Sequence, residues 1–350
     1  MSENRIHAVS TVTSGRLNGG RILVVGGYGA VGTTVTSALG DWFPGRVVVG
    51  GRSETRVRQL GGVRIDVSDP ASFRRTLDEL GDVALVVLCV EPSGPGVARV
   101  CLERGIHLVG IGATQRLLKG VADLHDLAAH RGATAVLSVG VAPGLTNLLA
   151  RRAHEAVQGA ERIDLTVLLG SGERHGHDAV RWTVEGLAEP AASHPKRTLL
   201  PGYGERTAHA FPFSDQHTLP HTLGVGQVTT RLCLDSRLLT TALFGLRRAG
   251  LLRAARRESV RRALVATFSR VHLGGDGFAV RADAWRGDSH AAYVLSGRAQ
   301  SRVTGLVAAY VTRELLTSAP PAGVHHIDQL PALTSLPEAL TPNGVSLQRL

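Results

Sequence analysis

The sequence predicts an α/β protein with two sheets, a doubly wound parallel sheet followed by a mainly antiparallel one. Three observations support this fold class. Short aliphatic runs alternate with helical segments through the first part of the chain, closely spaced glycines follow the first run, and a different alternating pattern begins at Ile163. With 350 residues, the chain is long enough for two domains that each have a substantial core.

The first aliphatic run, Ile22 to Val25, ends in glycines with the spacing G-x-G-x-x-G. These are Gly27, Gly29 and Gly32, with Ala30 and Val31 between the last two. The run suits a buried parallel strand, and residues 33–39 can continue as a helix. In such a unit the glycines permit a tight turn, the approach of a pyrophosphate and close helix packing, and the helix N-terminus favours phosphate. We therefore predict a dinucleotide-binding loop; the alternative is a glycine-rich turn without a ligand.

The residues after the second strand, Val47 to Val49, indicate which dinucleotide is bound. A site selective for NAD usually has an acidic residue here, which accepts a hydrogen bond from the ribose. This chain has Arg52 and Ser53, which can pair with a 2′-phosphate and donate a hydroxyl hydrogen bond. These residues favour NADP(H). The alternatives are a solvated Arg52 and a ribose contact from Glu54.

Further strands are predicted at 63–67, 83–90, 106–114 and 135–139, each separated by a helical segment, so the sheet is of the Rossmann type. Ligands of such sheets bind beyond the carboxyl ends of the strands. We therefore expect cofactor contacts from loop residues at these ends, namely Asp66, Val90, Glu91, Pro143 and Gly144.

The second part of the chain offers candidates for acid–base catalysis. A strand at 163–169 is followed by a glycine-rich junction that carries His175 and His177. A neutral histidine at a helix N-terminus can donate a proton to a reduced substrate. Asp215 and His217 are a second candidate pair, in which the carboxylate orients the ring. The alternatives are exposed loop histidines and a simple proline-containing turn.

The composition excludes several classes of protein. The net charge is +10, but the arginines are scattered and no nucleic-acid-binding motif is present. No apolar run is long enough to span a membrane, the spacing of Cys89, Cys101 and Cys233 fits no metal site, and residues 1–19 are expected to be a disordered lead-in. We expect a cytoplasmic protein with reduced thiols. Residues 238–271 are basic and amphipathic, which is typical of a solvated surface helix or, alternatively, of a membrane or acidic-partner contact.

The segments ILVVGGYGAVG, VVVGGRS, RIDVSD, GIHLVGIGAT and GVAPGLTNLLA, in this order, resemble the saccharopine dehydrogenase-like oxidoreductases. The resemblance implies a Rossmann domain over 20–147 and 301–350, including a returning C-terminal helix, and an inserted substrate and dimerisation domain over 148–300. We also expect the protein to be a homodimer. One departure is Leu108-Val109-Gly110, where such proteins often have Tyr-Val-Asp. The family substrate is therefore not carried over.

The sequence thus predicts an NADPH-dependent oxidoreductase that reduces a C=N or C=O bond of a small metabolite, in a bacterial biosynthetic pathway. Neither Lys119 nor Lys196 has a tyrosine four residues before it, which argues against a short-chain dehydrogenase mechanism. Two alternatives stay open: an enoyl or keto reductase that acts on a lipid or carrier-bound substrate, and a nucleotide-binding protein without turnover.

Overall fold

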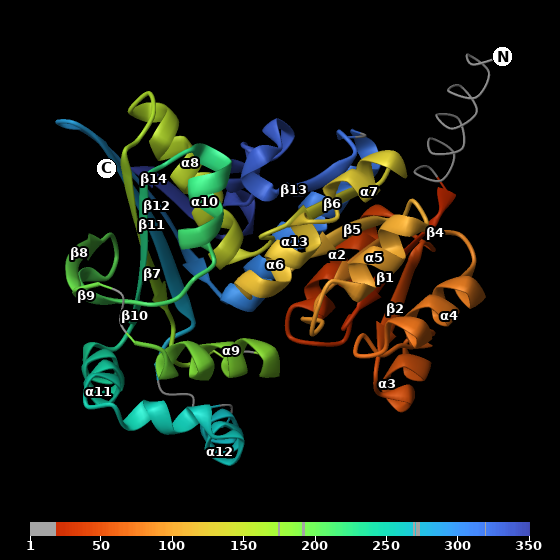
Figure 1. Cartoon of the computed structure of the whole chain (residues 1–350), viewed down its shortest axis with the longest axis horizontal. Helices are drawn as coiled ribbons and strands as arrows, with labels where there is room; N and C mark the ends of the chain where they lie inside the picture. The colour runs from red at the N-terminus through yellow and green to blue at the C-terminus, as the bar shows by residue number, and fades with distance from the viewer. Residues whose placement is uncertain (1–18, 174–175, 191–192, 269, 271–273, 319) are drawn as a thin grey trace. The chain divides into compact units, whose positions relative to one another are not determined.

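The computed structural model describes residues 19–173, 176–190, 193–268, 270, 274–318 and 320–350 (Figure 1). The chain forms two compact units. The first unit extends to Gly140 and includes Thr304–Leu333, and the second unit comprises Val141–Val303 and Thr334–Leu350. Apart from Gly19, the expected disordered lead-in over 1–19 lies outside the described residues.

The first unit contains a parallel sheet of seven strands in the order β13-β6-β5-β4-β1-β2-β3 (Figure 1). The strands are β1 (Arg21–Val25), β2 (Val47–Gly51), β3 (Val63–Arg64), β4 (Val83–Leu88), β5 (His107–Gly110), β6 (Thr134–Leu137) and β13 (Gly323–His326). Every pairing between neighbouring strands is parallel. This confirms the predicted Rossmann-type sheet and adds β13, which the sequence analysis did not find.

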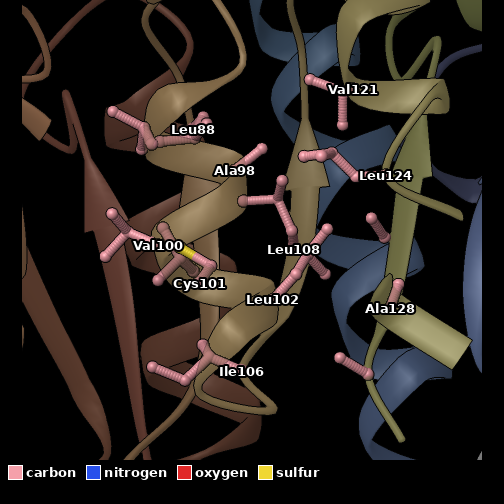
Figure 2. Close-up of a cluster of buried hydrophobic side chains, with 14 of the residues drawn as sticks. Leu88, Ala98, Val100, Cys101, Leu102, Ile106, Leu108, Val121, Leu124 and Ala128 are labelled. Carbon is pink, nitrogen blue, oxygen red and sulfur yellow. The ribbon is translucent and has the colours of Figure 1, made fainter. Parts of the chain in front are cut away.

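Helices cover both faces of this sheet. They are α2 (Gly32–Trp42), α3 (Glu54–Gln59), α4 (Pro70–Leu80), α5 (Gly96–Glu103), α6 (Gln115–Ala122), α7 (His125–His130) and the Thr304–Thr317 part of α13 (Gln300–Thr317). Successive side chains of a strand point to opposite faces, so that Leu23 and Val25 join one buried cluster. Figure 2 shows this cluster, in which α5 places Val100, Cys101 and Leu102 among the strand and helix side chains. The apolar packing fixes where the strands end, and hence where their loops lie.

The second unit contains a mixed sheet in the order β14-β12-β11-β7-β10-β9-β8. Its strands are β7 (Arg162–Leu169), β8 (Lys196–Leu200), β9 (Gly204–Ala210), β10 (Gln227–Leu234), β11 (Gly277–Arg286), β12 (Ser289–Arg298) and β14 (Ser346–Arg349). Only β7 and β10 pair in parallel among these described strands. The mainly antiparallel second sheet is therefore confirmed.

The helices of the second unit follow the chain around this sheet. They are α8 (Thr146–Ala156), α9 (His177–Ala188), α10 (Asp215–Leu223), α11 (Arg237–Arg248), α12 (Glu258–Phe268) and α14 (Leu336–Ala339). Short turns of other helical types are η1 (Val141–Leu145), η2 (Leu251–Arg256) and η5 (Thr341–Asn343) in this unit, and η3 (Ile327–Gln329) and η4 (Pro331–Leu333) in the first.

Two expectations about chain organisation differ from the structure. We expected all of 301–350 in the first unit, but β14 pairs with β12 in the second sheet. We also expected the basic segment 238–271 to form one amphipathic helix. It is divided into α11, η2 and α12, because Gly250 has φ +78° and ends the first helical path. No helix in the described part of the chain is long and apolar enough to cross a membrane.

His107 on β5 should make stability depend on pH. Its Nδ1 atom accepts a hydrogen bond from the Thr134 N–H at 3.0 Å, a role that needs the neutral ring, and burial lowers the pKa of His107. The unfolded chain then binds more protons than the folded protein as the pH falls below about 6.5. His107 therefore contributes stability above that pH, which is lost as the pH falls through the folded pKa.

We expect His107→Asn, whose side-chain oxygen can still accept from Thr134, to lose less stability between pH 7.5 and 5.5 than the native protein. The melting temperatures of both at the two pH values provide the measurement. The difference should be about 2 °C or more. Acidification that affects both proteins equally would show that His107 is not the titrating group.

Candidate dinucleotide-binding site

The loop between β1 and α2 is shaped by the close approach of the helix to the strand. A Cβ atom on Gly32 would lie 2.1 Å from the Gly26 carbonyl oxygen, and one on Gly27 would lie 2.9 Å from the Val24 carbonyl oxygen. Both distances are too short for a side chain, so the close packing of α2 against β1 requires glycine at both positions. No side chain caps the N-terminus of α2. The Thr33 and Thr34 N–H groups donate to the carbonyl oxygens of Gly29 and Val31 at 3.0 and 3.1 Å, so an anion can accept hydrogen bonds from the N–H groups that precede them.

The sequence analysis missed two residues of this loop. Gly26 has φ +78°, in the left-handed region that favours glycine, so the turn itself depends on Gly26. Tyr28 reaches across to the end of β2, where its hydroxyl oxygen accepts a hydrogen bond from the Ser53 N–H at 3.0 Å. A Cβ atom on Gly51 would lie 2.3 Å from the Tyr28 ring. The sequence feature that could have revealed this contact is the presence of a tyrosine inside the G-x-G-x-x-G loop.

Arg52 has a different environment from its neighbours. Ser53 accepts a hydrogen bond from the Arg56 N–H at 3.5 Å as the N-cap of α3, and the Glu54 carboxylate is paired with Arg58 at 2.5 Å. Arg52 is exposed and makes no hydrogen bond or salt bridge with any residue that the structure describes. The acid that could have served a ribose therefore has a partner, whereas the Arg52 guanidinium is available for an anion.

Asp66 and Glu91 both hold loops at the carboxyl edge of the sheet. The Asp66 carboxylate accepts hydrogen bonds from the Ser68 N–H at 2.9 Å and the Ser68 hydroxyl at 2.8 Å, which lower the pKa of Asp66. Glu91 Oε2 accepts from the Ala113 N–H at 3.0 Å, so it ties the loop after β4 to the loop after β5.

Val90 and the exposed Ala30 lie at the glycine loop itself. Val90 Cγ1 is 2.7 Å from the position that a Cβ atom on Gly26 would take, and Val31 is half-buried just before α2. The side chain of Val90 therefore contacts the loop directly. Cofactor contacts from these three residues stay a prediction.

Pro143 and Gly144 lie in the second unit, in the turn that precedes α8. Asn147 is fully buried and organises this turn, because its Oδ1 atom accepts from the Gly144 N–H at 2.9 Å and its Nδ2 atom donates to the Thr218 hydroxyl at 3.4 Å. The PGLTN motif is thus a rigid turn held by its own asparagine. A contact of Pro143 and Gly144 with the nicotinamide stays a prediction.

The predicted catalytic residues occupy separate environments. His175 lies outside the described residues, and His177 is exposed as the first residue of α9. Asp215 is fully buried as the first residue of α10, whereas His217 is exposed on that helix, and burial of part of its ring lowers its pKa. Residues two positions apart on a helix do not face each other. The expected orientation of His217 by Asp215 is therefore wrong.

Two further features bear on the chemistry of the chain. Phe211 and Phe213 pack with Trp182 at centroid distances of 5.1 Å and are buried in the core, so neither lines a pocket wall there. Among the described residues, no group of three or more His, Cys, Asp or Glu side chains could hold a metal ion.

The parallel sheet, the glycine loop and the helix that follows it place the first unit in the class of NAD(P)-binding dehydrogenase domains. Residues 22–136 match the family model described as "Saccharopine dehydrogenase NADP binding domain". This match confirms, over these residues, the resemblance found in the sequence, and it supports NADP(H) as the cofactor. Three features of the site fit this cofactor. No side chain caps α2, a Cβ atom on Gly32 would have no room, and the Arg52 side chain makes no hydrogen bond or salt bridge with any described residue.

Searches of solved structures find two-domain dehydrogenases at low similarity. The C. glutamicum DAP dehydrogenase in complex with DAP is 16% identical, with 92% of this chain and 98% of that chain covered and a TM-score of 0.47. An engineered D-amino acid dehydrogenase bound to NADP+ is 15% identical, with the same coverage and a TM-score of 0.46. A probable dehydrogenase from Thermotoga maritima is 11% identical over 93% of this chain and 98% of that chain, with a TM-score of 0.45.

Proposed function

We propose that the protein is an NADPH-dependent oxidoreductase that reduces a C=N or C=O bond of a small metabolite in a biosynthetic pathway of the cytoplasm. Two observations together carry this proposal: the N-terminus of α2, after the glycine loop, has no side-chain cap, and Arg52, after β2, makes no hydrogen bond or salt bridge with any described residue. The first favours a pyrophosphate and the second favours a 2′-phosphate. We also propose that the active form is a homodimer.

The chain's own residues have distinct roles in this proposal. The amide groups at the start of α2 bind the pyrophosphate, Arg52 pairs with the 2′-phosphate, and Tyr28 holds the segment that carries Arg52 in place through Ser53. Bound NADPH supplies the hydride. A histidine, His175 or His177, donates the proton that the substrate nitrogen or oxygen gains.

Two steps test this function. Titration with NADPH should enhance the fluorescence of the reduced nicotinamide, and consumption of NADPH should then be followed with a panel of imine-forming pairs, ketones and aldehydes. Turnover with at least one class of substrate is expected. Tight NADPH binding without consumption across the panel would favour a nucleotide-binding protein without turnover.

His177→Ala should lower turnover at least tenfold with little change in NADPH affinity. Loss of a positioned proton donor typically costs about 10²–10⁴ in rate, and His177 lies in the second unit, away from the glycine loop in the sequence. The same result is expected for His175→Ala. His130→Ala, which removes an exposed histidine from the first unit, is the matched control. Equal turnover in His177→Ala and the control would transfer the proposed role to His217.

A lipid or carrier-bound substrate is the second candidate. It is favoured by Leu238, Leu246 and Leu251, which are exposed on α11 and η2 at 84%, 45% and 63%. NADPH consumption with an enoyl or ketoacyl thioester, but not with small ketones or imines, would support this candidate over the first.

A further inference from the structure

A cavity of about 1100 Å³ lies within the second unit, between the β8–β9 hairpin and helix α11. Figure 1 shows the positions of these elements. One side is the face of β9 that carries Glu205, Thr207 and His209, and the other side is α11 from Arg237 to Arg248. The carboxyl end of α9, residues 193–195, Arg197 and Arg253 also line it. The volume suits an organic molecule of metabolite size.

The lining has a strong excess of positive charge. It contains two glutamates, Glu189 and Glu205, against six arginines, which are Arg197, Arg206, Arg237, Arg247, Arg248 and Arg253. Like charges gathered in a concave site repel one another and raise the local concentration of anions. An anionic ligand would relieve this repulsion.

Hydrogen bonds to backbone carbonyls hold several of these guanidinium groups in place. Arg247 donates to the carbonyl oxygens of Ala210 at 2.5 Å and Glu189 at 3.0 and 3.1 Å, and burial lowers the pKa of Arg247. Arg237 donates to the Glu205 carbonyl oxygen at 3.1 Å. A guanidinium has five N–H donors. The N–H groups that these bonds do not use can bind a ligand, and the bonds reduce the conformational freedom of the arginine side chains.

Other donors of the lining have no protein partner within the described chain. The side chains of Arg248 and Arg253 are exposed and make no hydrogen bond or ion pair with the described residues. Their N–H groups are therefore available to the oxygen atoms of an anionic ligand.

An aromatic pair supplies an apolar side of the same cavity. His209 and Phe244 stack with a centroid distance of 4.2 Å and an interplanar angle of 6°. Burial and the charge of Arg247 lower the pKa of His209, which favours the neutral ring. The cavity thus joins a cluster of anion donors to a flat apolar surface.

We propose that this cavity binds a phosphorylated organic molecule, with Arg237, Arg248 and Arg253 on the phosphate and the His209–Phe244 pair against the organic part. A phosphate group offers three oxygens and about two negative charges, which match several converging guanidinium groups better than one carboxylate does. The inference goes beyond the proposed redox activity and does not depend on it, because every residue named belongs to the second unit.

Calorimetric titration with inorganic pyrophosphate tests the proposal. The protein is first saturated with NADP+, which occupies the glycine loop. The native protein should bind pyrophosphate, and the double variant Arg237→Gln/Arg248→Gln should bind it at least tenfold more weakly. Arg257→Gln/Arg262→Gln, which removes two exposed arginines outside the lining, should bind like the native protein. Absence of binding to the native protein, or equal affinity in both double variants, would overturn the proposal.

A second set of titrations identifies the source of the phosphate. Glycerol 3-phosphate is compared with vesicles of phosphatidic acid in phosphatidylcholine and with pure phosphatidylcholine. Binding of the soluble ester supports a free metabolite, and binding only of the phosphatidic acid vesicles, lost in Arg237→Gln/Arg248→Gln, supports a lipid headgroup. Binding of neither contradicts the proposal. NADPH affinity, measured in parallel, tests the proposed redox function separately.

Discussion

Gly32→Ala should reduce NADPH affinity by at least 100-fold and lower the stability of the first unit. The added Cβ atom would lie 2.1 Å from the Gly26 carbonyl oxygen and 2.7 Å from Gly27 Cα, and neither backbone group can move without displacing α2 from β1. The pyrophosphate then loses the amide donors at the start of the helix. Fluorescence titration with NADPH and thermal unfolding measure the two effects.

Gly40→Ala is the matched control, because it makes the same change in the same helix. A Cβ atom on Gly40 meets no other atom within 4 Å, so this variant should bind NADPH normally and gain up to about 1 kcal/mol in stability. If Gly32→Ala also binds NADPH like the native protein, the loop geometry described above does not hold the cofactor.

Arg52→Asp should weaken NADPH binding by at least 100-fold while it changes NADH binding little. The exchange replaces a guanidinium that can pair with the 2′-phosphate by a carboxylate that repels it, and NADH has no 2′-phosphate. The added carboxylate can accept from the ribose hydroxyl groups of NADH. Titrations with the two cofactors measure both affinities.

The control for this variant is Arg58→Asp, which makes the same change in charge on the exposed side of α3. Its preference between the two cofactors should equal that of the native protein. Equal weakening of NADPH and NADH by Arg52→Asp would assign Arg52 a general structural role. In that case Arg56, which lies over the Tyr28 ring at 5.5 Å, becomes the candidate for the 2′-phosphate.

The sequence predicted the first unit well where local chemistry decides the structure. A four-residue aliphatic run cannot be exposed, and three glycines at the right spacing leave few alternatives to a strand, a turn and a helix. The loop residues at the carboxyl edge followed from the topology of a parallel sheet. Tyr28 was missed because its role is a contact with Gly51 and Ser53, more than twenty residues away in the chain.

Other features depend on contacts that no local pattern reports. β13 is a four-residue strand that joins β6 only because α13 returns the chain to the first sheet. The arginine-lined cavity combines residues of β8, β9 and α11, whose spacing in the sequence shows only a basic amphipathic segment. Asp215 and His217 are close in sequence, but the helical turn between them directs one into the core and the other to solvent.

The central claim is that the glycine loop and Arg52 form an NADP-selective site. The most direct measurement is calorimetric titration of the native protein with NADPH and with NADH under the same conditions. The account predicts one NADPH per chain, bound at least tenfold more tightly than NADH, a difference of about 1.4 kcal/mol or more. Equal affinities, or tighter binding of NADH, would contradict it.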